Sequence, residues 1–369
     1  MAKNLEEIMG FENMLGMFSD PRGDVPADFI PPSFLPGAGN TRNVFGDAAS
    51  YFRVKGNRQT AKLVQYGSPS TAVEIKGVDK VPVTLMHTAE NYKHGLTVLE
   101  SLRDFDSPAR QEWGRSELAR RNRQLRARVN NLRVSAMMSL WRHGKIFFDS
   151  AGNLLPSSSS ASTTVDSGIN TTTNTDACQD IGGTAIRTAD WSTAGTKITT
   201  QIKTVKETAL KRTGYPIRNA WYGAGILGFL LGNTELTKVI QGNPTIATGF
   251  ASGEIPNGFL GLNWIPIYGS FFEDADGSLQ DWFPDDYVVF TPDASPDWWE
   301  WILGSYPVPT SLQPTDSPEA ATSNIRRVFG MFSYSRILDD PPRIKQVGGD
   351  TFLPTLKVPD AIYIMDTVD

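Results

Sequence analysis

The sequence predicts an α+β fold, because strand-forming and helix-forming stretches occupy separate parts of the chain. From Tyr51 to Thr88, apolar and polar side chains alternate with a period of two, which is typical of β-strands. A helical pattern then continues for about 36 residues, from Ser107 to Gly144. Short apolar segments of strand type return between Arg327 and the C-terminus. A sheet with one long helix lying on it accounts for these three observations.

The length and charge of the chain argue against a small DNA-binding module. The 369 residues are enough for two or three folding units. There are 40 Asp and Glu against 35 Lys and Arg, whereas a dedicated nucleic-acid binder is usually basic. Cys178 is the only cysteine, so it cannot form an intrachain disulfide. Since we find neither a signal peptide nor an apolar run of about 18 residues, we expect a soluble protein made inside a cell.

Residues 1–50 are predicted to form an extended arm. A weakly amphipathic helical stretch is followed by DPRGDVPADFIPPSFLPGAGN, in which repeated prolines disfavour a helix. This segment carries Phe29, Ile30, Phe34 and Leu35, which an isolated loop could not bury. We therefore expect the arm to lie on another surface.

Hairpin signals follow the arm. The segments YFRVKG, AKLVQYG, TAVEIKG and KVPVTLM alternate in polarity and are separated by Gly56, Gly67 and Gly77. A two-stranded hairpin is only marginally stable alone. This part of the chain therefore needs a surface to lie on.

The long helix has recognisable ends and one apolar stripe. Ser107 is predicted to cap its N-terminus, Pro108 suits its first turn, and Gly144 suits its end. The stripe consists of Leu118, Leu125, Val129, Leu132, Ala136 and Leu140. Arginines at positions 110, 115, 120, 121, 123, 126, 128, 133 and 142 mostly occupy the other faces. Such a helix is expected to lie on a sheet with its charged side outward.

The arginines also raise the alternative that the helix, over residues 110–142, binds nucleic acid. Its basic stretch has the look of the basic region of a leucine-zipper protein. A zipper, however, needs a leucine heptad that continues beyond the basic region. Here the apolar stripe runs through the arginines and the helix ends at Gly144. Nonspecific phosphate contact stays open, as does a nucleic-acid-binding protein that uses this helix.

The second half of the chain begins with a Ser/Thr-rich insertion, residues 150–185, which has too little apolar surface for a core of its own. A compact α/β unit is predicted after Trp191, with a helix near residues 193–212 and a short apolar helix in GILGFLL. Its strands are predicted in RNAWYG, LNWIPIYG and DYVVFTP. Four strands, in RVFGMFSYS, PRIKQV, TFLPTL and DAIYIMDT, are predicted to close the chain.

The sequence has no motif that is typical of catalysis, cofactor binding or metal binding. The three histidines, His87, His94 and His143, lack the spacing of a metal site. There is no nucleophile elbow, phosphate-binding loop or dinucleotide-binding glycine motif. An enzyme would need a pocket in residues 190–315, and we name no catalytic, cofactor-binding or metal-binding residue.

Four stretches carry a resemblance to a known family, and together they span most of the chain from about residue 60. They are YGSPSTAVEIKGVDKVPVTLMHTAENY, ELARRNRQLRARVNNLRVSAMMSLWRHGKIFFDSAGNLL, DWSTAGTKITTQIKTVKETALKRTGYPIRNAWYG and DDPPRIKQVGGDTFLPTLKVPDAIYIMDTV. Their order resembles that of tailed-bacteriophage major capsid proteins, which have the Hong Kong 97 fold. More narrowly, the chain is similar to the lambda-type major capsid protein E family.

The resemblance implies an order of domains. Residues 1–50 would be the N-terminal arm, 51–95 the extended β-hairpin called the E-loop, and 96–150 the P domain with its spine helix. Residues 151–189 would be the Ser/Thr-rich insertion, 190–315 the α/β A domain, and 316–369 the return strands of the P domain.

The same resemblance implies a structural protein and not an enzyme. It would be a major head protein that self-assembles as hexamers and pentamers into an icosahedral shell around genomic DNA. It would be found in the virion, after assembly in the host cytoplasm. Expected partners are other copies, scaffolding and decoration proteins, the portal vertex and nonspecifically contacted DNA, with no cofactor, metal or membrane. The residues expected at assembly interfaces are Phe29, Ile30, Phe34, Leu35, Tyr66, Arg120, Arg121, Arg123, Arg126 and Arg128.

Overall fold

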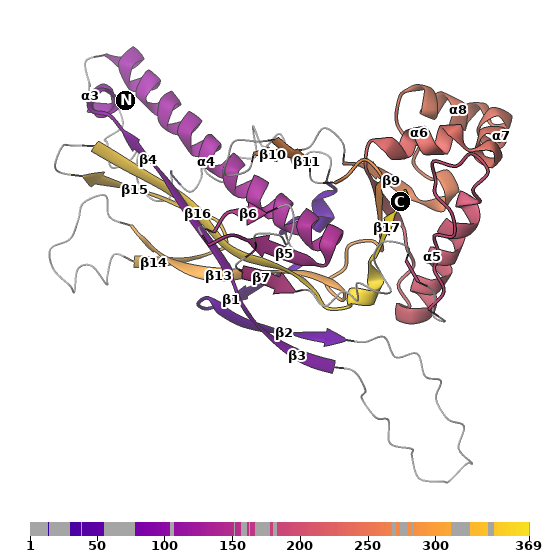
Figure 1. Ribbon diagram of the computed structural model, residues 1–369. Helices are drawn as coiled ribbons and strands as arrows, with labels where there is room; N and C mark the ends of the chain where they lie inside the picture. The colour runs from indigo at the N-terminus through magenta and orange to yellow at the C-terminus, as the bar shows by residue number, and fades with distance from the viewer. Residues whose placement is uncertain are drawn as a thin grey trace, which may run out of the picture.

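A computed structural model shows the arrangement of these elements (Figure 1). It describes residues 14, 30–37, 39–54, 78–103, 107–150, 152–155, 161, 163–166, 178–179, 183–267, 271–273, 279–281, 283–310, 325–338 and 343–368. Two units follow one another across the molecule, a sheet crossed by the long helix and a smaller sheet covered by four shorter helices. Among the described residues, no helix is both long and apolar enough to cross a membrane.

The long helix, α4, spans Pro108–His143, as the sequence predicted. Its 36 residues correspond to a length of about 54 Å at 1.5 Å per residue. Gly144 ends it in the left-handed conformation, with φ at 66°, and its N–H donates to the carbonyl of Leu140. Ser107 precedes the helix in extended conformation, but its side chain makes no capping hydrogen bond, so the predicted cap is wrong in that respect.

The burial of α4 confirms the apolar stripe and extends it. Leu118, Leu125, Val129, Ala136 and Leu140 are buried, and Leu132 is partly buried. From residue 133 to residue 141 every side chain is buried, so the last turns are enclosed on all sides. A helix that begins as a surface element therefore ends inside the core.

The sheet beneath α4 has six strands centred on β16. They are β1 (Thr41–Val44), β4 (Met86–His94), β13 (Trp299–Pro309), β14 (Ile325–Phe329), β15 (Phe332–Leu338) and β16 (Arg343–Leu356). Along one edge β16 pairs with β4, and along the other it pairs first with β15 and then with β13. All pairings are antiparallel except that of β1 with β13. Helix α3 (Leu96–Arg103) joins β4 to α4 and packs on the same face.

Two strand predictions in this sheet are wrong in detail. The segment RVFGMFSYS was expected to be one strand, but Gly330 adopts a left-handed φ of 71° and separates β14 from β15. The segments PRIKQV and TFLPTL were expected to be two strands, but they form the single strand β16. Because Gly348 and Gly349 are paired to neighbours on both sides, they continue the ladder and do not form a turn.

The predicted hairpin begins as a two-stranded ribbon of β2 (Ala48–Val54) and β3 (Val78–Thr84) (Figure 1). The segments AKLVQYG and TAVEIKG lie outside the described residues. One face of the ribbon rests on the sheet, where Tyr51 packs in a cluster with Leu85, Ile302 and Leu353. This contact supplies the surface that the sequence required.

The second unit has a four-stranded sheet in the order β17, β12, β8, β9, spanning Tyr363–Asp366, Tyr287–Thr291, Asn219–Tyr222 and Asn263–Pro266. Its helices are α5 (Ile198–Thr213), α6 (Gly225–Gly232), α7 (Thr234–Gly242) and α8 (Pro244–Ala251). Helix α5 begins later than predicted, because hydrogen-bonded turns between Asp190 and Thr196 precede it. Strand β17 was expected with the return strands under α4 but pairs with β12 in this second sheet.

Smaller elements complete the fold. Strands β5 (Lys145–Phe148), β6 (Leu154–Leu155) and β7 (Thr163–Asp166) form a three-stranded sheet after α4. Part of the predicted insertion is therefore β-structure. The pair β10 (Phe271–Glu273) and β11 (Leu279–Asp281) forms a hairpin, and 3-10 turns lie at η2 (Pro32–Phe34), η4 (Phe259–Gly261) and η5 (Pro359–Ala361).

Candidate assembly surfaces

Three of the arginines expected at assembly interfaces bind acidic side chains of their own chain. Glu117 accepts hydrogen bonds from Arg120 Nε and Nη2, both at 2.7 Å, and from Arg121 Nε at 2.9 Å. These bonds, the ones from Arg120 first, lower the pKa of Glu117 to about 2. Arg128 Nη2 donates to Glu90 of β4 at 2.9 Å. With these charges already paired, α4 is not favoured as the reading helix of a nucleic-acid-binding protein.

The two other arginines in this set differ in exposure. Arg123 is exposed to solvent, and Arg126 is partly buried. Arg121, besides its bond to Glu117, lies over the ring of Tyr92 with its guanidinium carbon 5.1 Å from the ring centroid. Arg121 therefore ties α4 to β4, and Arg123 presents its charge to solvent.

Arg133 does not lie on the charged back of the helix, where the sequence placed most arginines. Its side chain is 10% exposed, and its Nε donates to Oδ2 of the fully buried Asp350 on β16. Its guanidinium also lies over the ring of Phe352, 5.6 Å from the centroid. Burial raises the pKa of Asp350, although Arg133 acts in the opposite direction. This pair fixes α4 to the middle of β16, and no local pattern in the sequence connects the two residues.

Two histidines have structural partners in the same sheet. His87 Nδ1 lies 2.9 Å from Thr351 Oγ1, and His94 Nε2 lies 2.8 Å from Gln346 Oε1. Burial lowers the pKa of both histidines. In the described part of the chain, no group of three or more His, Cys, Asp or Glu side chains could hold a metal ion.

The apolar residues of the predicted arm are partly inside the core of their own chain. Ile30 and Phe34 are 2% and 1% exposed. The Phe34 ring packs edge-on against Trp141 and Trp221, with centroids 5.4 and 5.1 Å away. Its carbonyl accepts a hydrogen bond from Trp301 Nε1 at 2.7 Å. Ile30 and Phe34 therefore have no surface left for a neighbouring subunit, which corrects the prediction for these two residues.

The remaining predicted interface residues are less constrained. Leu35 is partly buried against the same core cluster. Phe29 and Tyr66 lie outside the described residues. On the ribbon, the most exposed apolar side chain among the described residues is Phe52 of β2, at 56%, opposite Lys80 of β3, and Val78 of β3 is exposed to 43%. The sequence could have indicated Phe52, because it alternates with the inward-facing Tyr51.

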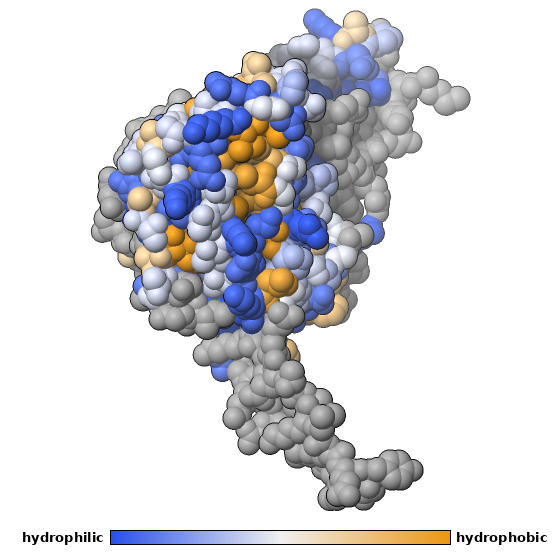
Figure 2. All heavy atoms as spheres, turned by 90° about the vertical axis from the view of Figure 1, so that its right-hand side faces the viewer, coloured by the Kyte–Doolittle hydropathy of each residue, from blue (hydrophilic) through white to orange (hydrophobic). Residues whose placement is uncertain are grey.

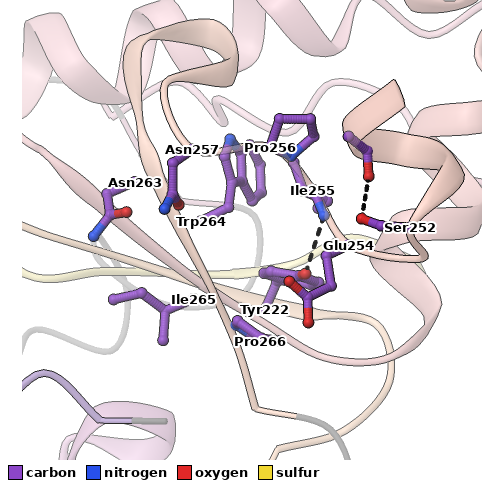
Figure 3. A pocket seen from close by; sticks show the side chains of 11 residues that line it. Tyr222, Ser252, Glu254, Ile255, Pro256, Asn257, Asn263, Trp264, Ile265 and Pro266 are labelled. Carbon is purple, nitrogen blue, oxygen red and sulfur yellow. Dashed lines mark hydrogen bonds between the residues drawn. The ribbon is translucent and has the colours of Figure 1, made fainter. Parts of the chain in front are cut away.

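A surface hollow of about 300 Å³ lies in the second unit, between the end of α8 and strand β9 (Figure 3). Its polar groups come from Ser252, Glu254, Asn257 and Asn263. The hydroxyl of Tyr222 accepts a hydrogen bond from the backbone N–H of Ile255, at 3.4 Å. The lining holds one carboxylate and neither histidine nor lysine, so it offers hydrogen bonds without an acid–base pair.

Comparison with known proteins gives a result at the level of structure. No protein-family model and no curated protein matches the sequence. A solved structure of a protein assigned as a prophage capsid protein from Escherichia coli CFT073 aligns over 98% of this chain and 99% of its own, with 13% identity and a TM-score of 0.54. This chain has a Hong Kong 97-like capsid fold. A phage-related protein from Bordetella bronchiseptica RB50 aligns over 97% of both chains, with 11% identity and a TM-score of 0.48.

Apolar side chains are exposed at separate places on this capsid fold. Besides Phe52 on the ribbon, Phe45 in the β1–β2 turn is 69% exposed and packs edge-on against Phe329, with centroids 5.3 Å apart. At the far end of the second unit, the helices expose Leu231 and Val239. Figure 2 shows an apolar patch on this end of the molecule, bordered by hydrophilic residues. Single exposed apolar side chains are ordinary, whereas an apolar patch bordered by hydrophilic residues is typical of an interaction site when it is large.

Proposed function

We propose that this chain is the major capsid protein of a tailed bacteriophage, which assembles as hexamers and pentamers into an icosahedral shell around genomic DNA. The observation that carries the proposal is the fold, which aligns with a prophage capsid protein over nearly the whole length of both chains. The role is structural and not enzymatic, and the protein is part of the virion.

The exposed ribbon supports a self-associating protein. Two strands alone bury too little surface to be stable, and the outer face of this ribbon carries Phe52 with more than half of its side chain exposed. Full burial of a phenylalanine contributes about 1.5–3 kcal/mol. A neighbour that covers Phe52 therefore gains about 1–2 kcal/mol at each contact, and a closed shell repeats that gain in every subunit.

The domain order stays part of this proposal. Residues 1–50 act as the N-terminal arm, 51–95 as the E-loop, and 96–150 with 316–369 as the P domain, except that β1, β4 and β13 lie in the sheet under α4 and β17 lies in the second sheet. Residues 190–315 act as the A domain, and 151–189 as a surface elaboration. Scaffolding and decoration proteins, the portal vertex and packaged DNA are the proposed partners, and assembly takes place in the host cytoplasm.

The proposed interface residues change accordingly. The proposed set adds Phe52 and keeps Arg123, Arg126, Phe29, Leu35 and Tyr66. Arg121 and Arg128 act first within their own subunit, by holding α4 against Tyr92 and Glu90 of β4.

Electron microscopy of the purified full chain, alone and with a candidate scaffolding protein, tests the proposal. We expect rings, tubes or closed shells, and we expect Phe52→Asp to raise the protein concentration needed for assembly about five- to thirtyfold, as a loss of about 1–2 kcal/mol per contact predicts. Phe52→Leu is the matched control, because it keeps an apolar side chain at the same place. A persistent small oligomer under both conditions would contradict the proposal.

A further inference from the structure

The sheet under α4 has a second face whose side chains are set by the pairing register. Three side chains show which positions point toward α4: Glu90 of β4 binds Arg128, Ser333 of β15 donates to Asn122, and Asp350 of β16 accepts from Arg133. Side chains alternate between the two faces along a strand. Odd-numbered residues of β4 and β16 and even-numbered residues of β15 therefore point away from α4.

Three cations stand side by side on that second face. In the register, Lys345 of β16 is opposite Lys93 of β4 on one side and opposite Arg336 of β15 on the other. Figure 1 shows these strands running side by side beneath α4. Lys93 and Arg336 are exposed and Lys345 is partly buried. We call Lys93, Lys345 and Arg336 the cationic row, and Arg343, also exposed, extends it two residues along β16.

The cationic row has no counter-charge among the described residues. Neither the three members of the row nor Arg343 forms an ion pair with a described residue. The guanidinium of Arg336 lies over the Tyr334 ring on the same face, 6.0 Å from its centroid. Asp339 and Asp340, which follow β15 in the sequence, lie outside the described residues. Like charges directly opposite each other destabilise a sheet, so this face is suited to an anionic partner.

We propose that the cationic row contacts the phosphate backbone of double-stranded DNA without reading its sequence. Neighbouring strands are about 4.8 Å apart, so the outer two cations are about 9.6 Å apart at the backbone. Double-stranded DNA carries one phosphate charge per about 1.7 Å of helix axis, or about six charges over that span. An extended acidic peptide presents same-face side chains only about every 6.8 Å, or two at most. The higher charge density of DNA therefore favours it over an acidic protein segment as the partner of three adjacent cations.

This assignment differs from the one that the sequence first suggested. The conspicuous arginines at positions 120, 121 and 128 are bound to Glu117 and Glu90, whereas the cationic row comes from residues far apart in the chain. The inference rests on the proposed shell function for its biological meaning, since it places packaged DNA against one face of the sheet. The binding itself is measured without assembly.

The test is binding of the full chain to random-sequence duplex DNA across a series of KCl concentrations. Each phosphate contact contributes a slope of about −0.9 to the plot of log affinity against log salt, so the row contributes about −2.7 in the wild type. We expect the triple variant Lys93→Gln, Lys345→Gln, Arg336→Gln to lose that slope. The matched control Arg120→Gln, Arg121→Gln, Arg128→Gln removes as much charge and should keep it.

Single variants keep the test decisive if the triple variant does not fold. Each single glutamine replacement in the row should lower the slope by about 0.9, whereas Lys345→Arg should leave it unchanged. An unchanged slope in the row variants, a loss confined to the α4 control, or no DNA binding by the wild type would each overturn the proposal. Row variants that bind DNA normally but no longer assemble would also overturn the proposal, and would assign this face of the sheet to a protein partner. Shells seen by electron microscopy together with unchanged DNA binding would leave the shell function standing without this contact.

Discussion

Replacing Asp350 by leucine leaves the Arg133 guanidinium without its partner at a site where that side chain is only 10% exposed. Breaking a buried ion pair by removing one partner typically costs about 3–5 kcal/mol, because an uncompensated charge stays in a region of low polarity. We expect Asp350→Leu and Arg133→Met each to lower the free energy of unfolding by about 3–4 kcal/mol. Joint replacement leaves no buried charge, so the double variant should lie within about 1–2 kcal/mol of the wild type.

Urea unfolding of the unassembled chain, followed by tryptophan fluorescence, measures these changes. Trp141, in the enclosed end of α4, is buried in the core and supplies a signal that changes on unfolding. Arg120→Met is the control, since its ion pair is on the surface, and it should leave the unfolding midpoint nearly unchanged. If the two single losses simply added in the double variant, the pair would not be coupled and the reasoning would be refuted.

Two further predictions concern the same sheet. Burial lowers the pKa of His94 from its ordinary value of 6.5, so the unfolded chain binds a proton at this residue more tightly than the folded chain does. The stability that the neutral histidine contributes is therefore complete above pH 6.5 and is lost as the pH falls below that value. Urea midpoints should therefore drop between pH 7 and pH 5, and His94→Gln should reduce that drop. A Cβ on Gly349 would lie 2.3 Å from the Thr88 carbonyl oxygen and 2.5 Å from the Phe332 ring, so Gly349→Ala should cost about 1–3 kcal/mol in the same assay. Gly228→Ala, with nothing within 4 Å of the new atom, should cost none.

Features that depend on neighbouring residues were predictable from the sequence. Helix α4 begins and ends where predicted, because its apolar stripe recurs at helical spacing and Gly144 tolerates the left-handed conformation that ends a helix. The strands around Ala220 and Val289 were also found, since continuous apolar runs mark strands that are buried on both faces.

Strand boundaries at glycines were not predictable in the same way. Gly330 ends a strand by taking a positive φ. Gly349 continues one, because its missing side chain leaves room for the Thr88 carbonyl and the Phe332 ring. Both look alike in the sequence, and only the neighbouring strands distinguish a turn from a close approach.

The sequence by itself determined the α+β class, the long helix, the ribbon and the resemblance to a capsid fold, since each depends on residues near one another in the chain. Only the tertiary structure decided which charges are paired. It buried Arg133 against Asp350, enclosed Phe34 among tryptophans, and aligned Lys93 with Lys345. Such contacts depend on strand register and on the packing of α4 over β16. They join residues more than 100 positions apart, so no local pattern encodes them.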